Sequence, residues 1–213
     1  MASEAQGAAT AAPDGFGSAV RDIAFFPVVM SAYAIFYAVW WPFAWGWAGA
    51  AALLVVLVAA VFLVVRGVSQ IRHAARFPDD PTPEIERERR AMTALNSVTH
   101  PIWLLGSILL FLLGLGRWTL PLMVFVIGAH FVPMARILDR RIDYLLGPVT
   151  MIAAIIAGIL ALDEQVSWLV VFAVAGVGGT VATLCYALYL AREYRLVCER
   201  AGVPFPAAAT PPR

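Results

Sequence analysis

Lysine is absent from this sequence, and all 15 of its basic residues are arginine. Together with the abundant alanine, this bias is more typical of a GC-rich bacterial genome than of a functional requirement. Charged residues make up only 14% of the chain, whereas soluble domains contain about 25%. This composition argues against a water-soluble fold. The net charge of +1 and the lack of a long basic run exclude a nucleic-acid partner.

Cysteine is scarce as well, and Cys185 and Cys198 lie 13 positions apart on or near the last expected helix. At helical rise that separation is roughly 20 Å, whereas the Cα atoms of a disulfide lie within about 7 Å. Both residues are therefore expected to be free thiols. No metal-ligand spacing surrounds either of them, so neither a metal nor a cofactor is expected.

Acidic residues are missing from the apolar segments, because all 14 fall in expected tails, loops or helix ends. Coupled carriers usually place a carboxylate within the membrane, so this distribution disfavours proton- or sodium-coupled transport. The sequence also lacks paired carboxylates, His-Glu-x-x-His and Gly-x-Ser-x-Gly. We therefore expect no enzymatic activity.

Long apolar runs dominate what is present, with 62% hydrophobic residues and a mean hydropathy of +0.81. Runs of about 18 residues or more can cross a bilayer as helices. We predict an all-α polytopic membrane protein, with a six-transmembrane-helix bundle over residues 21–200 embedded in the lipid bilayer. The predicted spans are 23–41, 48–65, 98–116, 118–135, 144–162 and 166–190.

The segments outside the spans are predicted to be two tails, one long loop and several short turns. Residues 1–20 show no apolar period and residues 201–213 contain four prolines, so both are predicted to be disordered cytoplasmic tails. A cytoplasmic loop at about 66–97 separates the second and third spans. Within it, Thr82 is suited to cap a helix whose first residue is Pro83.

The distribution of arginine predicts the orientation in the membrane. If both termini are cytoplasmic, 14 of the 15 arginines lie in cytoplasmic segments and only Arg117 lies outside. Six of the seven tryptophans then fall at the outer interface, where indole rings are favoured. We therefore expect a protein of the bacterial cytoplasmic (inner) membrane with both termini cytoplasmic.

Small residues at every fourth position predict how the last two helices pack. Close approach of backbones is a main driving force for helix association in lipid. An antiparallel hairpin of the fifth and sixth spans is expected along two such stripes. They are Ala153, Ala157 and Ala161 in the fifth span, and Ala175, Gly179, Thr183, Ala187 and Ala191 in the sixth.

One histidine is predicted to lie below the membrane surface. His130 precedes Arg136 by six residues and so lies roughly 9 Å from the inner interface. An ionisable group in such a segment is costly, which makes it a candidate functional residue. Because a tight turn joins the third and fourth spans, Asn96 and His100 are expected to converge with His130 on a cytoplasm-facing pocket, with Arg136 at its mouth.

The same segment carries a recognisable motif on Gly128, His130, Phe131, Pro133 and Ala135, followed by Arg140, Arg141, Tyr144 and Gly147. It resembles a group of uncharacterised bacterial multi-pass integral membrane proteins with a Gly-x-His-Phe-x-Pro-x-Ala transmembrane helix. The similarity extends loosely to Arg90 and Asn96, which adds Arg90 to the candidate pocket. The resemblance implies a membrane protein and brings no established activity.

Two functions remain open at this point. The favoured hypothesis is a structural or accessory membrane protein whose cytoplasmic surface contacts a protein partner or a second copy, with His130 bonded within the bundle. The alternative is a small-solute carrier or channel that uses the pocket around His130. A water-accessible cavity at His130 would favour the carrier, whereas a packed imidazole would favour the accessory role.

Overall fold

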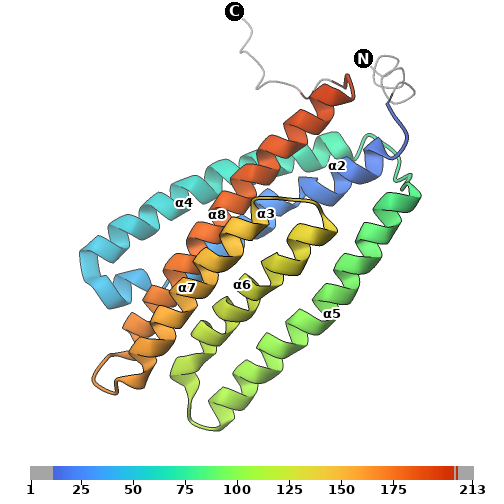
Figure 1. Cartoon of the computed structure of the whole chain (residues 1–213). Helices are drawn as coiled ribbons and strands as arrows, with labels where there is room; N and C mark the ends of the chain where they lie inside the picture. Colours follow the sequence, from blue (N-terminus) through green and yellow to red (C-terminus); the bar gives the residue numbers. More distant parts are fainter. Residues whose placement is uncertain (1–11, 204, 206–213) are drawn as a thin grey trace, which may run out of the picture.

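The computed structural model describes residues 12–203 and 205, and this part of the chain is helical throughout, without a strand (Figure 1). Six helical segments of the described residues are long and apolar enough to cross a membrane. This confirms the predicted all-α, six-helix membrane bundle. The elements are α2 (Phe16–Ala24), α3 (Phe26–Ala38), α4 (Trp41–Ala74), α5 (Pro83–Leu112), the 3-10 turn η1 (Gly116–Trp118), α6 (Thr119–Ile137), α7 (Asp143–Leu162) and α8 (Trp168–Arg200).

The first span begins earlier than predicted. The segment Phe16–Ala38 consists of α2 and α3, which meet at Phe25. Phe16 and Val20 of α2 are buried in the core, with Val20 fully inaccessible. The predicted disordered tail 1–20 is therefore wrong from Phe16 onward, because apolar side chains pack there; residues 1–11 lie outside the described part.

The predicted loop at about 66–97 is also wrong for most of its length. Helix α4 continues to Ala74 and α5 begins at Pro83, so only residues 75–82 are non-helical. Thr82 caps α5 as predicted, since its Oγ1 accepts a hydrogen bond from the backbone N–H of Ile85 at 3.5 Å. Hydropathy marks only the part of a helix that lies in lipid, which is why both helices were predicted too short.

The segment after α8 is packed where disorder had been predicted for 201–213. Val203 is only 5% exposed, and it belongs to the core cluster around Tyr194. The ring of Phe205 lies 5.2 Å from that of His73 and 5.3 Å from that of Tyr194. The prediction is therefore wrong for Val203 and Phe205, while residues 204 and 206–213 lie outside the described part.

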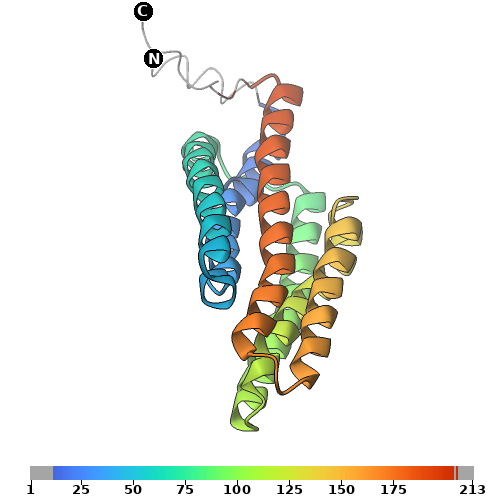
Figure 2. The same ribbon diagram turned by 90° about the vertical axis from the view of Figure 1, so that its left-hand side faces the viewer.

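Helix α8 is the central element, and it packs against α2, α3, α4, α6 and α7. In Figure 2 it stands between the α3–α4 pair and α7. The predicted α7–α8 hairpin is present, but Gly178 rather than Gly179 of the predicted stripe meets Ala153 of α7, and Gly179 faces α3. A Cβ atom at Gly179 would lie 2.6 Å from ring atoms of Tyr37, and one at Gly176 would overlap the Tyr37 carbonyl. Gly176 and Gly179 therefore let α3 approach the backbone of α8.

Candidate functional site

His130 bonds a residue that the sequence analysis did not select. Its Nδ1 lies 3.0 Å from Oγ1 of Thr99, so the hydrogen bond joins α6 to α5. Thr99 is the buried residue of α5, and the imidazole is half-buried. The expected meeting of the third and fourth spans near His130 therefore takes place through a threonine hydroxyl.

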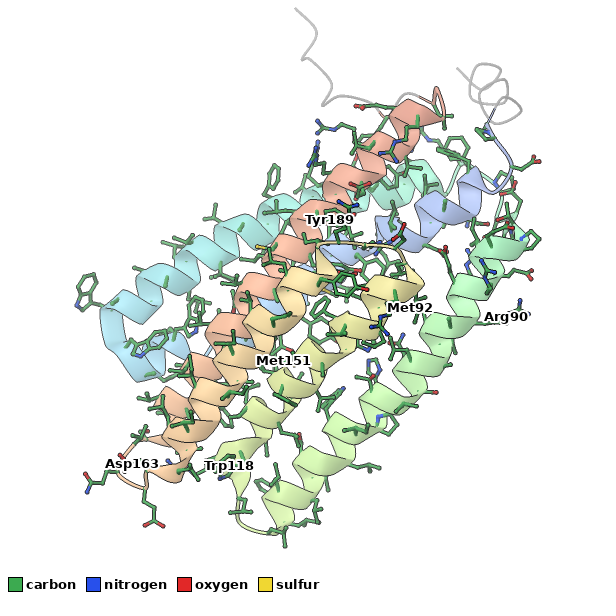
Figure 3. All side chains as sticks on the ribbon, viewed as in Figure 1. Arg90, Met92, Trp118, Met151, Asp163 and Tyr189 are labelled. Carbon is green, nitrogen blue, oxygen red and sulfur yellow. The ribbon has the colours of Figure 1, made fainter. Side chains whose placement is uncertain are left out.

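The other predicted members of the pocket lie around this bond without joining it. Nδ1 of His100 bonds the backbone carbonyl of Asn96 at 3.0 Å, and the His100 side chain is exposed. Arg90 and Arg136 are exposed, and Arg90 points away from the bundle in Figure 3. His130 lines neither of the two best-defined surface cavities of the described residues.

A buried carboxylate lies at the start of α7. Asp143 has no exposed surface, and neither carboxylate oxygen has a hydrogen-bond partner among the described residues. The nearby guanidinium of Arg140 donates from Nη1 to the hydroxyl of Tyr186 at 2.7 Å. The Tyr186 ring packs edge-on against Phe26 and Phe131, at 5.9 and 5.7 Å between centroids. The site thus places an acid, a guanidinium and a phenol in an aromatic surrounding.

Sequence reasoning missed Asp143 because of where it lies in the chain. It follows a basic turn and opens a helix, a position where acidic residues are ordinarily solvated and favoured by the helix dipole. Its burial follows from the packing of α7 against α6 and α8, and Tyr186 of α8 is 43 positions later in the sequence. No local pattern carries that information.

A second group of buried polar side chains joins α4 to α8. Gln70 donates from Nε2 to the carbonyl of Ala191 at 3.0 Å, and the Tyr194 hydroxyl donates to the carbonyl of Gln70 at 3.1 Å. Nδ1 of His73 lies 2.8 Å from the same hydroxyl. Because that hydroxyl already donates its proton, we assign Nδ1 of His73 as the donor to it. These hydrogen bonds join the C-terminal part of α4 to the C-terminal part of α8.

Charged residues then connect α2, α5 and the segment between α4 and α5. Arg89 bonds both carboxylate oxygens of Asp22, at 2.8 to 3.1 Å, and one oxygen of Asp79 at 3.0 Å. Ser18 donates to Asp79 at 2.5 Å, and Arg21 donates to the carbonyl of Phe77. The guanidinium of Arg89, followed by the Ser18 hydroxyl, holds the pKa of Asp79 below its usual value. We call this assembly, formed by Ser18, Arg21, Asp22, Asp79 and Arg89, the polar clasp.

The opposite end of the bundle is closed by aromatic rings and one arginine. The ring centroids of Trp40 and Trp168 are 5.8 Å apart, so the connection between α3 and α4 contacts the start of α8. Arg117 donates to the backbone carbonyls of Asp163 and Val166, both at 2.8 Å. Figure 3 shows Trp118 and Asp163 at this end, away from Arg90 and Tyr189.

Metal ligation finds no support in the described residues, since no group of three or more His, Cys, Asp or Glu side chains could hold an ion there. Cys185 is exposed and Cys198 is buried, and both are free thiols as predicted.

Comparison of the chain with protein-family models, with curated proteins and with solved structures finds no match. The resemblance of the Gly128–Ala135 motif to uncharacterised bacterial membrane proteins thus stays a prediction.

Proposed function

We propose that this integral membrane protein is a non-catalytic accessory component whose cytoplasmic surface binds another protein subunit. The observation that supports this most is the polar clasp. It joins helix ends that are far apart in the sequence into one ordered unit, together with the His73–Tyr194 and Gln70–Ala191 bonds. We call this unit the helical head.

The lengths of the helices support a head outside the bilayer. The backbone of α4 is non-helical at Gly46, so its continuous part is residues 47–74, which corresponds to about 42 Å at helical rise, and the 33 residues of α8 correspond to about 50 Å. The hydrocarbon core is about 30 Å thick, so both helices extend beyond it. These extensions belong to the arginine-rich end of the bundle. On the positive-inside rule, we assign that end to the cytoplasmic side of a bacterial inner membrane.

A small-solute carrier is the second candidate, and one observation favours it. Asp143 is a buried carboxylate without a hydrogen-bond partner, and ionisable groups of this kind mark proton or ion pathways in transporters. Against this, the imidazole of His130 is hydrogen-bonded to Thr99 and lines neither of the two surface cavities described above. The accessory role is therefore the better supported of the two.

Native mass spectrometry of the protein extracted from its own membrane tests the proposal. We expect a complex heavier than the 23.0 kDa chain by a stoichiometric protein subunit. Arg89→Ala opens the polar clasp and should release that subunit. Arg87→Ala removes an exposed arginine two positions away and should retain it, as should His130→Ala.

The same protein variants also distinguish the accessory role from the small-solute carrier. Solute flux in reconstituted vesicles that disappears in His130→Ala, with the melting temperature unchanged, would support the carrier and contradict the accessory role. A chain that carries no protein subunit under any extraction condition would also contradict it.

A further inference from the structure

A surface cavity of about 450 Å³ lies along the C-terminal part of α4, and its lining residues change from apolar at one end to basic at the other. Val64, Val65 and Val68 line one end, and Ser69, Arg72, His73 and Arg76 line the other. Its volume falls within the range of about 300–1,000 Å³ that is usual for ligand sites. No acidic side chain is among these residues.

Among the described residues, no carboxylate is paired with either arginine of this cavity. Neither Arg72 nor Arg76 forms a hydrogen bond or an ion pair with the described residues. The sequence from Ile23 to Pro78 contains three arginines and no acidic residue, whereas glutamates alternate with the arginines at the start of α5. Arg72 lies in the last turn of α4 and Arg76 lies just beyond the end of the helix, and both line the same cavity, so their side chains can reach a single phosphate.

The depth of the cavity matches the boundary between hydrocarbon and headgroups. Trp47, 85% exposed at the other end of α4, marks one membrane interface. About 30 Å of hydrocarbon corresponds to roughly 20 helical residues from there, which ends near residue 67. Val64 and Val65 then lie among acyl chains, and Arg72 lies at the level of the headgroups. This placement holds whichever side of the membrane the arginines face.

We propose that this cavity binds a phospholipid with an anionic headgroup, whose phosphate contacts Arg72 and Arg76 and whose acyl chain lies along Val64, Val65 and Val68. The apolar end opens onto the exposed face of α4, which includes Val61, Val65 and Val68, so a chain within the bilayer can enter it laterally. Ser69, one turn before Arg72 and His73, supplies a hydroxyl at the height of the phosphate.

Lipid retention by the purified full-length chain tests the proposal by native mass spectrometry with added phosphatidylglycerol or phosphatidylcholine. We expect wild-type protein to retain phosphatidylglycerol roughly 25-fold better, since two arginines near an anionic lipid surface contribute about fivefold each. The pair Arg72→Gln and Arg76→Gln should abolish the preference. The pair Arg87→Gln and Arg90→Gln makes the same charge change on exposed residues of α5 and should keep it.

Three results would overturn the proposal. The first is equal retention of both lipids by the wild type, a result that requires no variant to fold. The second is an equal loss of the preference for phosphatidylglycerol in both double glutamine variants, which would mean that the preference depends on the overall charge of the protein. The third is displacement of phosphatidylglycerol by an equal concentration of free glycerol phosphate, which would show that the apolar end is not part of the site.

Discussion

At the scale of single residues, two aspartates of one turn have opposite surroundings. Asp143 is buried without a hydrogen-bond partner, whereas Asp139 is exposed. A buried carboxylate that lacks hydrogen bonds costs several kcal/mol if charged, and an amide of the same shape costs less. We expect Asp143→Asn to raise the unfolding free energy by about 1–3 kcal/mol in a detergent melt.

Asp139→Asn is the matched control for that prediction. Asp139 has φ 48°, a left-handed conformation that asparagine also accepts, so its stability should change by less than about 0.5 kcal/mol. Destabilisation by Asp143→Asn would contradict the prediction, and would mean that the carboxylate is held by Arg140 as a charged pair.

The His130–Thr99 hydrogen bond allows a second measurement on single residues. Interhelical hydrogen bonds in membranes contribute about 0.6 kcal/mol on average and about 1.7 kcal/mol at most. A double-mutant cycle of His130→Ala and Thr99→Ala should therefore give a coupling energy in that range. The same cycle between His130 and His100 should give a smaller coupling energy. A larger coupling energy would support the predicted convergence of His100 and His130 on one pocket.

These residues show how far sequence reasoning reaches at this scale. The depth of His130 follows from counting residues, and its neighbouring helix follows from the short turn between the third and fourth spans. Its partner depends on how α5 is rotated about its own axis, which packing decides. That rotation turns Thr99 inward and leaves His100 exposed, although the two residues are adjacent.

At the scale of elements, the contact between α3 and α8 depends on glycine. A Cβ atom at Gly176 would overlap the backbone carbonyl of Tyr37, which cannot move without shifting α3. We expect Gly176→Ala to lower the unfolding free energy by about 1–3 kcal/mol, measured by the melting temperature. Val177→Ala, on the exposed side of α8, should have a much smaller effect, and equal losses would contradict the assigned contact.

The polar clasp predicts how the contact between α2 and α5 depends on pH. The folded pKa of Asp79 is lowered by Arg89 and Ser18 from the ordinary value of 3.8. A lowered pKa contributes stability that is fully present above the unfolded value and is lost as the pH falls through the folded one. The exchange rate of α2 amides, relative to the intrinsic rate of an unprotected amide at the same pH, should therefore rise on acidification below about pH 4.

Asp79→Asn provides the control for the clasp. The variant should exchange faster than wild type at neutral pH, and the acid-dependent rise should shrink because the titrating group is gone. An unchanged pH profile in Asp79→Asn would assign the acid sensitivity to another carboxylate.

Element boundaries were predictable only where lipid dictates them. The predicted span 144–162 and the helix Asp143–Leu162 nearly coincide, because charged residues flank the apolar run on both sides, Arg140 and Arg141 before it and Asp163 and Glu164 after it. The predicted span 166–190 falls ten residues short of Arg200, since residues beyond 190 are held by Tyr194 and Cys198 against the core. Helix ends that are set by tertiary contacts outside the bilayer cannot be predicted from hydropathy.

At the scale of the whole molecule, the two ends of the bundle differ in chemistry. The end that contains Trp40, Trp168 and Arg117 is closed by ring contacts and one arginine, whereas the other 13 arginines of the described residues lie toward the other end. An even number of crossings returns the chain to its starting side, so both termini should face the same compartment. On the positive-inside rule, we predict that this compartment is the cytoplasm.

A pair of labelling experiments in intact cells tests this orientation. A reporter fused after Arg213 that is active only in the cytoplasm should be active, whereas a periplasm-dependent reporter at the same place should be silent. A single cysteine at Glu164, in a chain with Cys185 and Cys198 replaced by alanine, should react with a membrane-impermeant thiol reagent, because Glu164 is exposed in the turn between α7 and α8. A single cysteine at exposed Arg87 should react only after the cells are lysed. The reverse pattern would place the arginine-rich head outside the cell, and the proposed cytoplasmic partner would be contradicted, while lipid binding at Arg72 and Arg76 would still follow from depth and charge.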